Sequence, residues 1–183
     1  FTSGDHEIVE RFGLEDVTPY GAKGKATEYG VVGKRGKDYR DALKKWGLDG
    51  QRSEGKFVPE EYKVAPLMTR WALIQGLMDT DGSVDALGHC EITLKQNALA
   101  DDFGQLLSSL GIKFGCSERM VAFEGKLYGP YRRFHFVVYA GDDAIRLERK
   151  HRRLRPRPRT RPLSEARHVT AITAVPSVPV KCV

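Results

Sequence analysis

Residues 66–82 carry the pattern that most constrains the fold of this chain. Apolar side chains recur there at helical spacing, and the range starts with proline and closes with glycine, the residue types favoured at the first position of a helix and just past its end. We therefore predict a helix over residues 66–82 that buries one side. The core-facing side chains are Leu67, Trp71, Ile74, Leu77 and Met78.

A second face of this helix carries small residues. Ala72, Gly76 and Thr80 stand four residues apart, which places them in one row along the helix. Small side chains in such a row let another helix approach closely. We expect a partner helix on this face.

Two carboxylates stand at the end of the helix, Asp79 and Asp81. The negative end of the helix dipole makes each of them unfavourable there by about 0.3–1 kcal/mol. If two such helices end side by side, their carboxylates come together, and a divalent cation between them makes this arrangement favourable. The alternative is that both aspartates are solvated turn residues.

The next part of the chain alternates strands and helices. Period-two alternation predicts strands, and the apolar spacing from Leu99 to Leu110 predicts a helix with Asn97 as its N-cap. In chain order, the expected elements are a strand at 89–95, a helix at 97–110, strands at 112–117 and 133–139 across a loop at 125–130, and a helix after Gly141.

The start of the chain repeats this order. A strand-like piece at residues 1–3 precedes a helix with Ile8 and Val9, strands near Val17 and Val31, and a helix that stops at Gly47. Strand, helix, strand, strand, helix therefore occurs twice, and only the second copy has a leading helix and strand, residues 66 to about 87. We treat internal duplication as a hypothesis.

Positive charge is concentrated in one segment. The chain has 30 basic and 24 acidic residues, but residues 146–161 alone hold eight arginines and Lys150 against one glutamate. Arginine forms bidentate contacts with phosphate, so this segment suits nucleic-acid binding. Because Arg-Pro repeats favour an extended path, the segment also suits a solvated linker, and both interpretations hold together.

Composition excludes several classes of protein. The longest apolar run, residues 136–140, is too short to cross a membrane, and the three cysteines are too few and too far apart for a disulfide framework or a zinc site. The first ten residues do not have the pattern of a secretory leader. We expect a cytoplasmic protein that does not bind membranes.

The sequence Ile74-Gln75-Gly76-Leu77-Met78-Asp79-Thr80-Asp81-Gly82 resembles the LAGLIDADG motif of homing endonucleases. Phe57-Val58-Pro59-Glu60-Glu61-Tyr62 resembles the lead-in found in the endonuclease domains of inteins, and residues 1–9 resemble the stretch that follows a first motif. The resemblance implies an α+β fold of paired αββαββα repeats, with motif helices at a pseudo-two-fold axis and two sheets forming a saddle on double-stranded DNA. It also implies a monomer with two repeats.

The resemblance also implies site residues. Asp81 would be the catalytic carboxylate that binds Mg²⁺, which supports phosphodiester hydrolysis by activating water and stabilising charge. Asp79 would support the helix end. Lys34 would be the assisting basic residue of the first copy, or else a solvated loop lysine, whereas Ala140 stands at the matching place in the second copy.

Polar side chains on the predicted strands fit a DNA-binding surface, because a sheet in the major groove can distinguish base pairs. We expect them all on one side of the second sheet, whereas Cys90 and Cys116 face the core. From the arginine run, we add two side chains as DNA contacts. The expected DNA-binding residues are Lys95, Lys113, Arg133, His135, Arg152 and Arg153, with Glu91 and Thr93 beside them.

The end of the chain suggests protein splicing. Residues 167–175 and 178–183 read as two short strands and resemble the penultimate splicing block of inteins, within a Hint-type splicing domain. In the class of inteins with cysteine in this block, that cysteine attacks the amino-terminal splice junction, so Cys182 is a candidate nucleophile. The alternative is a buried strand cysteine.

These patterns give a working division of the chain. Residues 1–65 would be the remainder of a first repeat and a linker, 66–150 the second repeat, 151–166 a basic linker and 167–183 the splicing segment. The leading interpretation is a homing endonuclease within a self-splicing intein, whose exteins would be a host protein such as a replicative helicase or a phage packaging motor. The alternatives are a DNA-binding domain that no longer cuts, or an intein that only splices.

Overall fold

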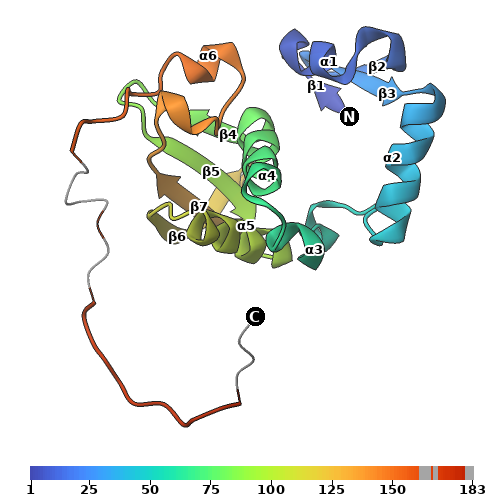
Figure 1. Ribbon diagram of the computed structural model, residues 1–183. Helices are drawn as coiled ribbons and strands as arrows, with labels where there is room; N and C mark the ends of the chain where they lie inside the picture. Colours follow the sequence, from blue (N-terminus) through green and yellow to red (C-terminus); the bar gives the residue numbers. More distant parts are fainter. Residues whose placement is uncertain (161–165, 167–168, 180–183) are drawn as a thin grey trace.

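A computed structural model describes residues 1–160, 166 and 169–179, and it places two antiparallel sheets in two halves of the chain (Figure 1). The N-terminal half, residues 1–56, contains a three-stranded sheet and two longer helices. Its elements are β1 (Thr2–Ser3), α1 (His6–Phe12), β2 (Val17–Lys23), β3 (Ala26–Val31) and α2 (Gly33–Lys45), with short 3₁₀ turns at Leu14–Asp16 and Ser53–Gly55.

The C-terminal half, residues 57–160, contains a four-stranded sheet and the remaining helices. It begins with α3 (Glu60–Lys63) and α4 (Leu67–Thr80), and ends with a 3₁₀ turn at Ala140–Asp142 and α6 (Glu148–His151). Between them lie β4 (Gly82–Val84), β5 (Cys90–Lys95), α5 (Ala98–Ser109), β6 (Phe114–Phe123) and β7 (Lys126–Phe136). The predicted α+β class is confirmed.

The two sheets share a strand order. The first runs β1-β3-β2 and the second β4-β5-β7-β6, so β5, β7 and β6 occupy the places of β1, β3 and β2. The first four elements also occur in the same order along the chain, strand, helix, strand and strand, whereas the helix that follows has 13 residues in α2 and four in α6. This correspondence supports the duplication hypothesis with an observation that is independent of sequence spacing.

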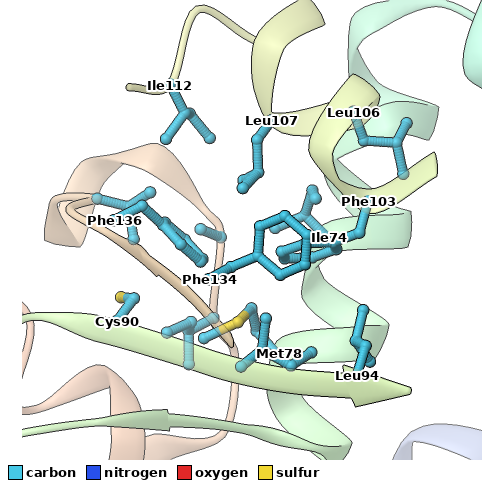
Figure 2. Packing of buried hydrophobic residues seen from close by; sticks show 14 of the residues in the cluster. Ile74, Met78, Cys90, Leu94, Phe103, Leu106, Leu107, Ile112, Phe134 and Phe136 are labelled. Atoms are coloured by element: carbon cyan, nitrogen blue, oxygen red, sulfur yellow. The ribbon is translucent and has the colours of Figure 1, made fainter. Parts of the chain in front are cut away.

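The main core lies between the second sheet and helices α4 and α5. Phe103 of α5 meets Phe134 of β7 edge to face, with ring centroids 5.2 Å apart, and Ile74 and Met78 of α4 are fully buried beside them (Figure 2). Burial along β5 alternates, as predicted, with Cys90, Ile92 and Leu94 inside. This layer holds α4 firmly against the sheet.

Helix α4 begins after Pro66, which takes the N-cap position, and Asp81 is its C-cap. Gly82 follows this C-cap and so stands just past the helix end, as predicted, and it is also the first residue of β4. The prediction that Pro66 is the first helical residue was wrong by one position. A Cβ at Gly82 would lie 2.8 Å from Met78 Cα. Glycine is therefore required here because the backbone approaches α4 closely.

The predicted loop at 125–130 was wrong. Strands β6 and β7 continue into a long hairpin that turns at Glu124 and Gly125, both with positive φ. Its outer half is exposed and mostly uncovered by helices, so the apolar alternation that marks a half-buried strand is lost there. The sequence pattern therefore predicts only the buried part of each strand.

The helix predicted after Gly141 was also wrong. Ala144, Ile145 and Leu147 are buried, but they lie in an irregular segment after the 3₁₀ turn. Asp143 adopts a left-handed conformation, and the following backbone N–H groups bond to a side chain of α4. Apolar residues here fill the core without helical spacing.

The tail does not form the expected strands where it is described. Residues 169–179 contain no strand, although they are rich in β-branched residues, because they pair with no neighbouring strand and are exposed. Within the described part of the chain, no helix is both long enough and apolar enough to cross a membrane.

Candidate functional site

The small-residue row of α4 faces solvent. Ala72, Gly76 and Thr80 are exposed, and no atom lies within 4 Å of the place where a Cβ on Gly76 would stand. Figure 1 shows α4 on the side of the C-terminal half that faces the N-terminal half. Among the described residues no helix packs on this row. The row is therefore open to the partner helix that the sequence predicts.

The two aspartates at the end of α4 differ sharply. Asp79 is buried, and its Oδ1 accepts the backbone N–H groups of Arg146 and Leu147 at 3.0 Å each. Asp81 is exposed, and its Oδ2 accepts the Thr80 hydroxyl at 3.2 Å. Asp79 therefore supports the helix end, whereas the Asp81 carboxylate is presented to solvent.

Lys150 approaches the same helix end from inside the protein. Its ammonium donates to the carbonyl oxygens of Met78 and Asp79, both at 2.7 Å, and only 4% of the residue is exposed. Burial lowers the pKa of Lys150. The expectation that Lys150 contributes to a phosphate-binding segment was wrong, because its charge points into the core.

The donor atoms at this helix end fit one side of a magnesium site. In the described residues, no group of three or more His, Cys, Asp and Glu side chains is arranged to hold a metal ion. Mg²⁺ keeps several waters and usually takes one or two protein carboxylates together with substrate phosphates. An exposed carboxylate at Asp81 supplies one such ligand.

The second sheet has a polar face opposite its core. The register pairs Glu91 with His135 and Thr93 with Arg133, and these side chains share the face that alternates with the buried residues. We call this surface the polar face. It comprises Glu91, Thr93 and Lys95 of β5, Tyr131, Arg133 and His135 of β7, and Ser117 and Arg119 of β6.

Acidic side chains neutralise part of the polar face. Glu91 lies 3.3 Å from both Arg133 Nε and His135 Nδ1, and Arg133 Nε is buried without a hydrogen-bond partner. Glu54 pairs with Lys95, and this contact lowers the pKa of Glu54 to about 2. DNA that binds here must compete with both carboxylates for these cations.

Of the other predicted basic residues, Lys113 lines the same pocket as Glu91 and His135 of the polar face, whereas Lys34, Arg152 and Arg153 lie on other elements. Lys34 is exposed at the start of α2, and Lys113, just before β6, donates to the Ala166 carbonyl at 3.2 Å. Arg152 pairs with Glu148, and Arg153 donates to the Val84 carbonyl at 2.8 Å. Arg153 therefore fastens the chain to edge strand β4.

The cysteines do not behave alike. Cys90 is fully buried, and this burial raises the pKa of its thiol to about 12. Cys116 is exposed, so its assignment to the core was wrong, because β6 is the edge strand and is poorly covered at that position. Cys182 lies outside the described residues.

Two anchoring residues, Lys150 and Asp102, are not predicted from the sequence. Lys150 lies in a run of basic residues that indicates an exposed segment, and Asp102 is one of two adjacent aspartates in α5. Asp102 is buried and binds both the Val58 backbone N–H and the Lys63 ammonium. Asp102 stands three residues after Leu99 and four before Leu106, on the apolar face of the helix, and this spacing is the sequence signal that indicates a buried carboxylate.

Comparison with known proteins identifies the region that contains these features. Residues 69–152 match the model of the LAGLIDADG-like domain. A DNA polymerase of Thermococcus hydrothermalis is 34% identical over 85 residues, which are 43% of this chain and 5% of the polymerase. Replicative DNA helicase DnaB of Mycobacterium intracellulare is 30% identical over 130 residues, which are 70% of this chain.

The chain therefore matches only a small part of each relative, 5% of the polymerase and 22% of the helicase. The matched region runs from α4 to the residue that follows α6, and so includes the exposed Asp81, the small-residue row and the polar face. Residues 69–152 of this protein are therefore similar in sequence to the LAGLIDADG-like domain.

Proposed function

We propose that this chain is part of an intein-encoded homing endonuclease that hydrolyses double-stranded DNA with Mg²⁺. The observation that carries the proposal is the placement of Asp81. Its exposed carboxylate stands where α4 passes directly into edge strand β4, at the border of the sheet that bears the polar face. A metal-binding carboxylate and a DNA-reading surface thus belong to one rigid unit.

The division of roles follows from these contacts. The exposed row Ala72, Gly76 and Thr80 would pack against a second motif helix, which would bring a second carboxylate beside Asp81. Bound Mg²⁺ would activate water for attack on a DNA phosphate. Lys95, Arg133 and His135 would bind DNA on the polar face, and Lys34 would assist from the N-terminal half.

The proposed architecture keeps the divisions suggested by the sequence. Residues 1–65 are the remainder of a first repeat with a linker, 66–150 the second repeat, 151–166 a basic linker and 167–183 a segment of the splicing domain. The matching strand orders of the two sheets support the two repeats. The helicase and polymerase relatives fit hosts interrupted by an intein, and Cys182 is the proposed splicing nucleophile.

The test is cleavage of a plasmid that carries the host gene without its insertion, in Mg²⁺. We expect Asp81→Asn to abolish cleavage while DNA affinity stays within about twofold, because the substitution removes a metal ligand and leaves the polar face intact. Asp41→Asn, an exposed change on α2, is the matched control. Parallel loss of cleavage and binding in Asp81→Asn contradicts the catalytic role.

A second candidate function is DNA binding without cleavage. It is favoured by the pairing of Lys95 and Arg133 with acids and by the single exposed carboxylate at the end of α4. Site-specific binding by the wild-type protein, with no strand cut in Mg²⁺ or Mn²⁺, would establish this function instead. Splicing is tested separately, since Cys182→Ala in the precursor should stop formation of the branched species.

A further inference from the structure

We infer that Lys150 is a positioning residue, which fixes the last turn of α4 and thereby the Asp81 carboxylate that the proposed endonuclease uses. The inference rests on the proposed function for its catalytic consequence. Its structural part concerns the contact between Lys150 and the helix end, and this part is testable without any cleavage.

Lys150 forms hydrogen bonds with backbone carbonyl oxygens that the end of a helix otherwise leaves without a partner. The last four carbonyls of a helix lack N–H partners within it, and α4 ends at Thr80. Lys150 Nζ lies 2.7 Å from two of these carbonyl oxygens, those of Met78 and Asp79. One buried ammonium therefore holds the two residues that precede Thr80 and Asp81.

Burial of the Lys150 ammonium needs a physical explanation. Burying an ammonium is costly, and an apolar side chain of similar length would fill the same space without that cost. The helix end carries the negative end of the dipole together with the carboxylates of Asp79 and Asp81. The positive charge of Lys150 offsets this negative potential. It therefore reduces the electrostatic repulsion between the helix end and the Asp81 carboxylate.

The segment that carries Lys150 is anchored on its other side to the N-terminal half. Arg149 forms two hydrogen bonds with the Asp5 carboxylate, at 2.7 and 2.8 Å, and Glu7 Oε2 accepts the Glu148 N–H at 2.9 Å. Arg11 donates to the Arg146 carbonyl at 2.7 Å.

Residues 146–150 therefore contact both halves at once. Asp79 and the carbonyls of α4 bind them from one side, and Asp5, Glu7 and Arg11 from the other. Because the catalytic geometry must be kept within fractions of an ångström, loosening this segment should slow cleavage more than it weakens DNA binding.

The experiment compares Lys150→Met with Lys63→Met. Both variants remove a lysine contact, but Lys63 binds Glu60 and Asp102, away from the end of α4. Amide hydrogen exchange is followed at Asp81, whose N–H bonds to the Leu77 carbonyl, and at Leu147, whose N–H bonds to Asp79. Cleavage is measured on the same preparations, with kcat and KM for DNA determined separately.

We expect exchange at both amides to rise about tenfold or more in Lys150→Met and to stay unchanged in Lys63→Met. We expect kcat to fall about tenfold or more, with KM within about threefold, and Lys150→Arg to recover part of kcat because it keeps the charge. Unchanged exchange at Asp81 overturns the inference, as does a kcat loss no larger than that of Lys63→Met.

The failure of the proposed function has a different signature. If the wild-type protein does not cut DNA, the endonuclease proposal fails, and exchange alone decides whether Lys150 fixes the helix end. If Lys150→Met does not fold, Lys150→Gln replaces it, because glutamine is polar but shorter and uncharged, and so loses the ammonium contact with the Met78 and Asp79 carbonyls. Unchanged exchange at Asp81 in that variant overturns the inference.

Discussion

Asp102 of α5 accepts the backbone N–H of Val58 at 2.8 Å, which joins the segment leading into α4 to the neighbouring helix α5. The same carboxylate lies 3.0 Å from the Lys63 ammonium. We expect Asp102→Ala to lower the free energy of unfolding by about 1–3 kcal/mol, since it leaves a buried N–H without a partner. Urea denaturation measures this loss.

The neighbouring Asp101→Ala is the control for that prediction. Asp101 is exposed and pairs with Arg132 on the surface, so its removal should cost less than about 1 kcal/mol. Equal losses in the two variants would show that the Val58 contact does not contribute more to the free energy of unfolding than a surface ion pair does.

The two aspartates at the end of α4 should separate stability from activity. Asp79→Ala deprives two backbone N–H groups of their acceptor, so we expect the free energy of unfolding to fall by about 2 kcal/mol or more. Asp81→Asn should change it by less than about 0.5 kcal/mol, because the side chain is exposed. A large stability loss in Asp81→Asn would assign that residue a structural role.

Gly76 provides a test of the exposed row on α4. An added Cβ meets open space there and φ is not positive, so Gly76→Ala should raise the free energy of unfolding of this chain by about 0.5–1 kcal/mol. When a second helix packs on the row, the same methyl group should instead weaken that association. Calorimetry of the 183-residue chain that shows destabilisation would mean that the row is already covered.

Glu54 should restrain DNA binding through Lys95. Its pKa is lowered to about 2 by the Lys95 contact, so Glu54 is ionised at neutral pH, and its favourable contribution is lost only as the pH falls from about 4.5 towards 2. Glu54→Gln should therefore tighten DNA binding about threefold at low salt, and less at high salt. Fluorescence anisotropy across a salt series measures this gain.

Glu10→Gln removes the same charge from α1 and serves as the control. An equal gain in both variants would show that net charge, rather than release of Lys95, improves the binding.

Burial of Cys90 should make its thiol inert. Its pKa of about 12 keeps it protonated at pH 8, whereas the exposed Cys116 should react with a disulfide reagent. The unfolded thiol ionises near pH 9 and the folded one does not, so the free energy of unfolding should fall between pH 9 and 12 by up to about 1.4 kcal/mol per pH unit. Peptide mapping after labelling checks the reactivity, and rapid labelling of Cys90 would contradict the burial.

Much of the fold could be predicted where burial imposes a period on the sequence. The alternation along β5 and the spacing of Leu99, Phe103 and Leu106 along α5 gave the correct elements, and Asn97 caps α5 as expected. The irregular segment 143–147 could not be predicted, because its conformation depends on a hydrogen bond to Asp79, which is more than 60 residues away.

In the candidate site, too, features set by local spacing are predictable, whereas features set by contacts between distant residues are not. The exposed Asp81 and the row of small residues follow from spacing within one helix. The ion pairs of Glu54 with Lys95 and of Glu91 with Arg133 depend on contacts across the fold, so the sequence alone overstated the positive charge that the polar face offers. Lys150 was misassigned for the same reason, since a run of basic residues does not reveal which side chain turns inward.

The outer half of the β6–β7 hairpin lies beyond the cover of the helices and buries almost nothing. Substitutions in that stretch have few packing neighbours to disturb, so mutations can accumulate there at little cost to the stability of the domain. The hairpin tip is thus where a lineage of such proteins can diversify its surface most freely while inheriting an unchanged core.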